Sequence, residues 1–90
     1  MKARNVMGNK GRTVVNQIII SDDSGLDWWF QSYDATIVYY NDEEDQVYLD
    51  PIYWNYSRTT TKYLCKVLRR TPKEIRDGID EGIYILKDLN

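Results

Sequence analysis

The spacing of apolar residues changes near the middle of the chain, and this change restricts the fold to one with strands first and helices after. Residues 13–49 contain short runs of Val, Ile, Tyr and Trp, separated by polar turn residues, a pattern that favours strands. After Ser57 the apolar residues recur at helical intervals, because Tyr63 and Val67, with the Leu that follows each, fall on one side of a helix. A chain of 90 residues has room for one domain. The pattern therefore predicts a single α+β domain.

The strand pattern occurs in four segments. Residues 13–20 are rich in Val and Ile, and a dense turn signal follows them. Segments 27–32 and 36–40 are either two strands joined by a tight turn or one long bulged strand. Segments 36–40 and 47–49 flank the polar residues 41–45, which is the spacing of a hairpin. We expect a three- or four-stranded, mainly antiparallel sheet.

Two helices are expected in the last third of the chain, packed on one face of the sheet. The first is capped by Ser57 or Thr59, and its basic face extends over 58–70. The sequence Thr-Pro-Lys-Glu at 71–74 has the form of a capping box with proline at the first helical position, so it begins the second helix. Residues 83–86 form either a short closing strand or an extended tail.

The first twelve residues differ from the rest of the chain. Residues 1–12 hold four basic side chains and two glycines and show little apolar periodicity. We therefore expect a flexible basic arm over 1–12, followed by the domain at 13–90.

Cysteine usage and hydropathy indicate a cytoplasmic protein that does not enter a membrane. Cys65 is the only cysteine, whereas a small secreted domain usually carries several disulfides. The longest apolar runs are far shorter than the roughly 20 residues that cross a bilayer, and no signal-like segment is expected.

Charge is sorted along the chain although the net charge is only −2. Between Ser21 and Asp50 there are nine carboxylates and no Lys or Arg. Between Arg58 and Arg76 there are seven Lys and Arg residues and a single Glu. This segregation predicts a molecule with one acidic and one basic region.

Residues for catalysis are scarce. The chain has no histidine, so the side chain most often used as a general base is missing. Cys65 has Lys62, Lys66 and Arg69 nearby in a helix, but no residue is an obvious base partner for its thiol. The adjacent carboxylates at 42–45 lack the alternating ligand spacing of a calcium loop. We therefore expect a protein that is not an enzyme and has no metal or cofactor.

Aromatic and acidic residues together predict a protein-binding surface. The chain has eight tyrosines and three tryptophans, and such residues dominate binding hot spots. Consecutive aromatics in a strand, such as Trp28 and Trp29, point to opposite faces, so an open sheet face should carry some of them. The preferred function is docking on a protein that has a basic surface. Its residues would be Trp28, Trp29, Tyr39, Tyr40, Asp42, Glu43, Glu44, Asp45 and Tyr48.

The alternative function is weakly specific nucleic-acid binding by the basic face of the helix at 58–70. A third possibility is a self-assembling structural protein, for example a homodimer, in which the acidic strands of one copy meet the basic helix of another. The candidate nucleic-acid-binding residues are Arg58, Lys62, Lys66, Arg69 and Arg70.

The segment Tyr53–Tyr63 resembles a group of small uncharacterised proteins of phages and mobile elements. The shared pattern is an aromatic pair, a Ser-x-Thr-Thr run and a Lys-Tyr helix, and the closing residues 82–90 are also similar. The chain departs from this pattern at Val67, where an aromatic residue is more usual. The resemblance implies a phage-type accessory protein in the host cytoplasm, such as an inhibitor of host defence. Nucleic-acid mimicry against a nucleic-acid-binding effector, as in anti-CRISPR proteins, is one form of such inhibition.

Overall fold

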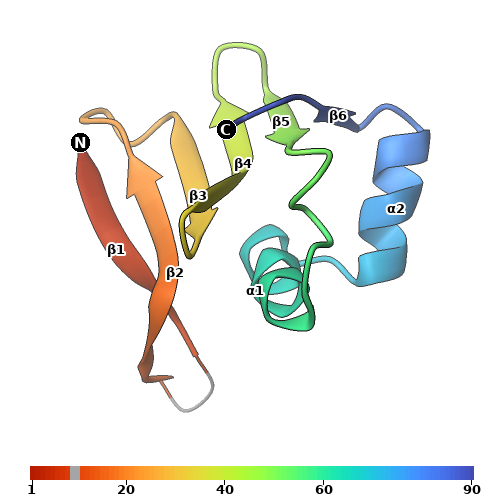
Figure 1. Ribbon diagram of the computed structural model, residues 1–90. Helices are drawn as coiled ribbons and strands as arrows, with labels where there is room; N and C mark the ends of the chain where they lie inside the picture. The colour runs from red at the N-terminus through yellow and green to blue at the C-terminus, as the bar shows by residue number, and fades with distance from the viewer. Residues whose placement is uncertain (9–10) are drawn as a thin grey trace.

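In the computed structural model, the described residues, 1–8 and 11–90, form a six-stranded sheet and two helices (Figure 1). The strand order in the sheet follows the sequence; β1 to β5 pair antiparallel, and β5 pairs parallel with β6. The α+β class and the mainly antiparallel sheet are confirmed, but the sheet has six strands instead of three or four. The elements are β1 (Lys2–Met7), β2 (Thr13–Ser21), β3 (Trp28–Ser32), β4 (Ala35–Asn41), β5 (Gln46–Leu49), α1 (Arg58–Leu68), α2 (Pro72–Asp80) and β6 (Tyr84–Leu86).

One additional strand comes from the segment that was expected to be a loose arm. Residues Lys2–Met7 pair with β2 from Lys2 opposite Ser21 to Met7 opposite Thr13. The prediction failed because β1 is an outer strand whose side chains are exposed except for Val6, so it lacks an apolar alternation. Such a strand is held by backbone hydrogen bonds, which any sequence can supply. Residues 9 and 10 of the predicted arm lie outside the described residues.

The last strand settles the two alternatives for residues 83–86. Tyr84–Leu86 pairs in parallel with β5, Val47 lying opposite Tyr84 and Leu49 opposite Leu86. Parallel neighbours need a long crossover, and here α1 and α2 supply it. Figure 1 shows α2 beside β6, at the edge of the sheet.

Strands β3 and β4 combine both alternatives that the sequence left open. They are two strands joined by a turn at Tyr33 and Asp34. The pairing also shifts between Phe30 and Gln31, so that Ile37 is an extra residue on β4. Ile37 is buried, so the bulge places an additional apolar side chain in the core.

Both helices contribute side chains to the core that the sheet covers, and Figure 1 shows them on the same side of the sheet. Phe30, Val38 and Leu49 lie opposite one another on neighbouring strands and are fully buried. Leu64 of α1 and Ile75 of α2 belong to the same core cluster. The other sheet face is therefore left without helices.

The helix ends follow local rules. The side chain of Ser57 accepts a hydrogen bond from the Thr60 amide and caps α1, and Thr71 and Glu74 form the predicted capping box of α2. Helix α1 ends at Leu68, before the predicted residue 70, because Arg69 adopts a left-handed conformation at the C-cap. None of the helices in residues 1–8 and 11–90 is long and apolar enough to span a bilayer.

Candidate functional site

A row of stacked aromatic rings crosses the sheet face that the helices leave open. Trp29, Tyr39 and Tyr48 lie opposite one another on β3, β4 and β5, each next in sequence to a buried core residue and thus on the other face. The ring centroids are 5.1 Å apart for Trp29 and Tyr39 and 5.9 Å apart for Tyr39 and Tyr48. Ile20 and Ile85 extend the row on β2 and β6. We call Trp29, Tyr39 and Tyr48 the aromatic ladder.

Carboxylates hold the hydroxyl groups of the ladder. The Tyr39 hydroxyl donates to Oδ2 of Asp27 at 3.0 Å, and the Tyr48 hydroxyl donates to Oε1 of Glu44 at 2.7 Å. Burial, together with the bond to Asp27, raises the pKa of Tyr39, and the bond to Glu44 raises the pKa of Tyr48. Both phenols therefore stay neutral well above physiological pH. Their hydroxyl groups hold the carboxylates of Asp27 and Glu44 in place beside the ladder.

The nine residues predicted to form one docking surface lie on two sides of the sheet. Trp28 and Tyr40 face the helices, where Trp28 packs against the core and stacks on Tyr40 at 5.8 Å. The Tyr40 hydroxyl donates to Asp45 at 2.9 Å, whereas Glu44 accepts a hydrogen bond from Tyr48 of the ladder. The period-two alternation of a strand imposes this division, so one continuous patch of all nine residues does not form.

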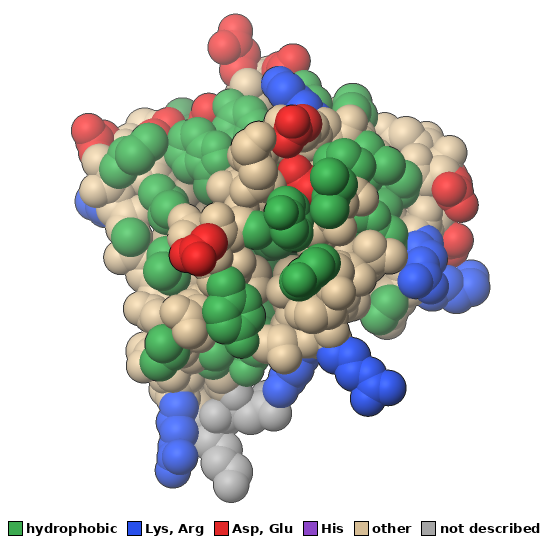
Figure 2. Space-filling view, in the orientation of Figure 1, with side chains coloured by type: hydrophobic (Ala, Val, Ile, Leu, Met, Phe, Trp, Pro, Cys, Tyr) green, Lys and Arg blue, Asp and Glu red, His purple; other side chains and the backbone are tan. Residues whose placement is uncertain are grey.

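Few acids and bases form ion pairs in the part of the folded chain that the structure describes. Among the described residues, the side-chain ion pair is Lys73 with Asp77, at 3.3 Å, and the terminal amine of Met1 also pairs with Asp23. Figure 2 shows acidic side chains at the end that carries the β4–β5 loop and several basic side chains at the opposite end, with further acidic side chains in the middle of this face and beside basic ones at the right. The ammonium of Lys87 lies 5.1 Å from the centroid of the Tyr48 ring, so the ladder has a cation beside it as well.

Asp50 was counted with the acidic surface but is a buried structural residue, only 1% exposed. Its carboxylate accepts hydrogen bonds from the amides of Ile52, Tyr53 and Leu89 and from the side chain of Asn90, at 2.9 to 3.0 Å. Burial alone would raise the pKa of Asp50, but these bonds outweigh it and lower the pKa. The signal in the sequence was an Asp directly before Pro51, which is typical of a side chain that caps a turn.

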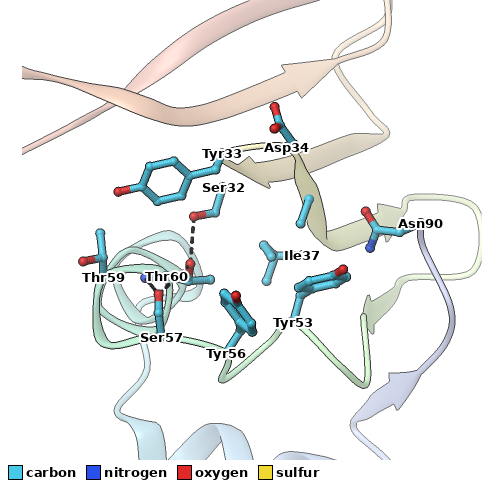
Figure 3. Close-up of a pocket in the computed structure, with 11 residues that line it drawn as sticks. Ser32, Tyr33, Asp34, Ile37, Tyr53, Tyr56, Ser57, Thr59, Thr60 and Asn90 are labelled. Atoms are coloured by element: carbon cyan, nitrogen blue, oxygen red, sulfur yellow. Dashed lines mark hydrogen bonds between the residues drawn. The ribbon is translucent and has the colours of Figure 1, made fainter.

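A cavity of about 570 Å³ lies between the β3–β4 turn, the segment after β5 and the start of α1 (Figure 3). Tyr33, Tyr53 and Tyr56 contribute rings to its walls, and Ile37 lies between them. Tyr33 is 53% exposed and Tyr56 is 71% exposed. We call this the tyrosine cavity. It was not predicted from the sequence, because its walls come from three separate segments.

A second hollow, of about 540 Å³, lies between α1 and α2. Arg58, Lys62 and Arg76 line it, and none of its lining residues is an acid. We call it the cationic groove. Of the predicted nucleic-acid-binding residues, only Arg58 and Lys62 line this groove, and Arg69 and Arg70 follow the end of the helix. Nucleic-acid binding by the whole basic face of α1 stays a prediction.

Cys65 also lines the groove, half-buried. Burial raises the pKa of its thiol, so the uncharged form predominates at neutral pH. A role as nucleophile has no support in this geometry. Within the described residues, no three His, Cys, Asp or Glu side chains gather to hold a metal ion.

The comparisons with known proteins give a family but no function. No curated protein and no solved structure matches the chain significantly. Residues 1–82, which include all of β1 to β5, α1 and α2, match the model of a family of unknown function, DUF8033, and the chain therefore belongs to that family.

Proposed function

We propose that the protein is a non-enzymatic binding protein that docks its open sheet face on a basic surface of another protein. The observation that carries the proposal is the aromatic ladder with two carboxylates fixed beside it. Aromatic rings provide large contact area at a low cost in side-chain entropy, and they dominate the energy of many interfaces. The carboxylates provide the charge that selects a basic partner.

Stacking supports a preformed interface. Tyr39 is held by rings on both sides and by Asp27, so its ring has little freedom left to lose on binding. Rigid groups bind more tightly because the entropy of ordering them has already been lost in folding. The exposed acidic side chains of the β4–β5 loop, residues 42–45, add charge at the end of the face and should speed association.

The biological role is a further part of this proposal. The resemblance of Tyr53–Tyr63 to phage proteins suggests an accessory protein that inhibits a host defence protein, and that resemblance is its only support. A basic, nucleic-acid-binding host protein would fit the acidic face, because the carboxylates can occupy positions normally taken by phosphates.

The test is affinity capture from a host lysate with four forms of the tagged protein. Wild type and Ile52→Ala should retain the same partner at about 0.1 M salt, where surface charges act over roughly 10 Å. Trp29→Ala should lose the partner, because truncating a hot-spot ring weakens binding by about 30-fold or more. Glu44→Lys should lose it through charge reversal. Ile52 is the matched control because it is 69% exposed and lies outside the ladder.

Thermal denaturation shows whether each variant is folded, and Tyr48→Leu replaces Trp29→Ala if the latter is not. High salt should release the captured partner from the wild type. The proposal is wrong if the ladder variants capture the same partner as the wild type, or if the folded wild type captures none.

A further inference from the structure

The tyrosine cavity and the cationic groove are neighbours. Tyr56 and Ser57 line both hollows, so the two meet at the start of α1. Tyr56 stands at this junction, with the rings of Tyr33 and Tyr53 on its cavity side and three cations on its groove side. Each hollow has a volume within the roughly 300 to 1,000 Å³ that small-molecule sites occupy.

The cavity suits a flat, uncharged ring. Tyr53 and Tyr56 meet edge to face, with centroids 5.6 Å apart and planes at 62°, so they form two walls of a corner. The only charged residue in the lining is Asp34, and Figure 3 shows its carboxylate directed away from the three tyrosines. The hydroxyl groups of Tyr33, Tyr53 and Tyr56 make no hydrogen bonds within the described residues, so they are available to polar atoms at the edge of a base.

The groove suits phosphate. Arg58, Lys62 and Arg76 form no ion pairs among the described residues, and Arg76 instead lies 5.8 Å from the Trp54 ring centroid. The first turn of α1 has no acidic residue, so the positive end of its dipole is not neutralised there. Arg58 and Lys62 come from α1 and Arg76 comes from α2, so cations on both helices are available to the phosphates of a strand.

We propose that this composite site binds single-stranded nucleic acid, with an unstacked base in the tyrosine cavity and the adjoining phosphates in the cationic groove. Stacking on aromatic rings beside a positive groove is how proteins hold single strands without reading sequence. A duplex cannot place a base in the cavity because its bases are already stacked and paired. This site is separate from the aromatic ladder, and the proposal holds whether or not the ladder docks on a protein.

The test uses a fluorescently labelled oligothymidylate of about ten nucleotides, with binding followed by fluorescence anisotropy at low salt. Tyr56→Ala should weaken binding by at least about fivefold, the effect of losing one stacked base. Lys62→Glu should weaken binding and make it less salt-dependent. For the wild type, three phosphate contacts correspond to a slope of roughly −2 in a plot of the logarithm of the binding constant against the logarithm of the salt concentration, and the variant should give a shallower slope. Tyr48→Leu on the ladder should leave binding unchanged.

Lys66→Glu is the matched control, because Lys66 is an exposed cation of α1 that does not line the groove. If it weakens binding as much as Lys62→Glu, the general basic face of α1 binds the strand and the composite site is refuted. Equal affinity for a duplex of the same length, or no binding of the folded wild type at low salt, also refutes it. Tighter binding of thymidine monophosphate than of the strand would instead assign the site to a free nucleotide.

Discussion

The aromatic ladder and the tyrosine cavity both contain tyrosines that solvent reaches at least in part, yet the hydroxyl groups of these tyrosines are bonded differently in the two regions. On the sheet face, Tyr39 and Tyr48 donate to carboxylates of the same molecule. In the tyrosine cavity, none of the three hydroxyl groups has a partner within the described residues. A polar group that is satisfied internally loses nothing when it docks, whereas one that is free can select a ligand. The ladder therefore suits a large contact area, whereas the cavity leaves hydroxyl groups free to bond to the polar edge of whichever base stacks there.

The charges beside the rings also differ in sign. Asp27 and Glu44 lie beside the ladder, with Lys87 over Tyr48, whereas Lys and Arg side chains of α1 and α2 line the groove that adjoins the cavity. The two faces should consequently select partners of opposite charge, and high salt should weaken both interactions. Four predictions test how the two regions depend on one another.

The largest effect is expected at Asp50, which joins the two regions. Asp50 lies directly after β5 of the ladder, and its carboxylate holds Tyr53 and Asn90 of the cavity wall. Asp50→Ala should lower the free energy of unfolding by about 3 kcal/mol or more, because it leaves several buried amides without an acceptor. Urea denaturation measures this loss. Asp34→Ala, at an exposed carboxylate of the cavity, should change stability by less than about 0.5 kcal/mol.

The same carboxylate should make stability depend on pH. Its pKa in the folded protein lies below its ordinary value of 3.8, so its contribution is complete above that pH and is lost as the pH falls towards the folded value. The unfolding free energy of the wild type should decrease below about pH 4 more steeply than that of Asp50→Asn. If the unfolding free energy fell equally steeply with pH for the two proteins, the Asp50 carboxylate would not be what holds the wall of the tyrosine cavity.

The sequence predicted what depends on local pattern. The cap at Ser57, the capping box at Thr71 and the hairpin around residues 41–45 follow from short-range rules, and all three are present. The outer strand β1 was missed because its pairing is a property of the backbone and leaves little trace in the side chains. Whether residues 83–86 form a strand could not be decided locally, because their partner β5 lies more than 30 residues earlier.

The candidate sites were predictable to a lesser extent. Alternation within a strand predicted that Trp28 and Trp29 would separate, and an open face with aromatics and acids is present. The grouping of Tyr33 with Tyr56 was not predictable, because it depends on where the β3–β4 turn lies relative to α1. Arg76 was counted in the basic region but was not a candidate binding residue, and only the packing of α2 beside α1 places it in the groove.

A smaller effect is expected where α2 supports the edge of the ladder. A Cβ atom on Gly78 would lie 2.7 Å from ring carbons of Tyr84 in β6, which explains a glycine inside a helix. Gly78→Ala should destabilise the protein by about 1 kcal/mol, because the free-energy cost of overpacking against Tyr84 exceeds the gain from the higher helix propensity of alanine. Asp80→Ala, on the exposed side of α2, is the control. A more stable Gly78→Ala variant would show that β6 moves away from α2 easily.

The smallest effect concerns the hydroxyl groups of the ladder and appears only at high pH. Because the pKa values of Tyr39 and Tyr48 lie above their ordinary value of 10.0, the folded protein favours their neutral forms. Their stabilising contribution is complete below pH 10 and is lost as the pH rises through the folded values. Glu44→Gln should therefore shift part of the tyrosine absorbance titration to lower pH, because it removes the charge that accepts from Tyr48. Superimposable titration curves for the wild type and Glu44→Gln would mean that this bond is absent in solution, and the ladder would then resemble the tyrosine cavity in having a free hydroxyl group.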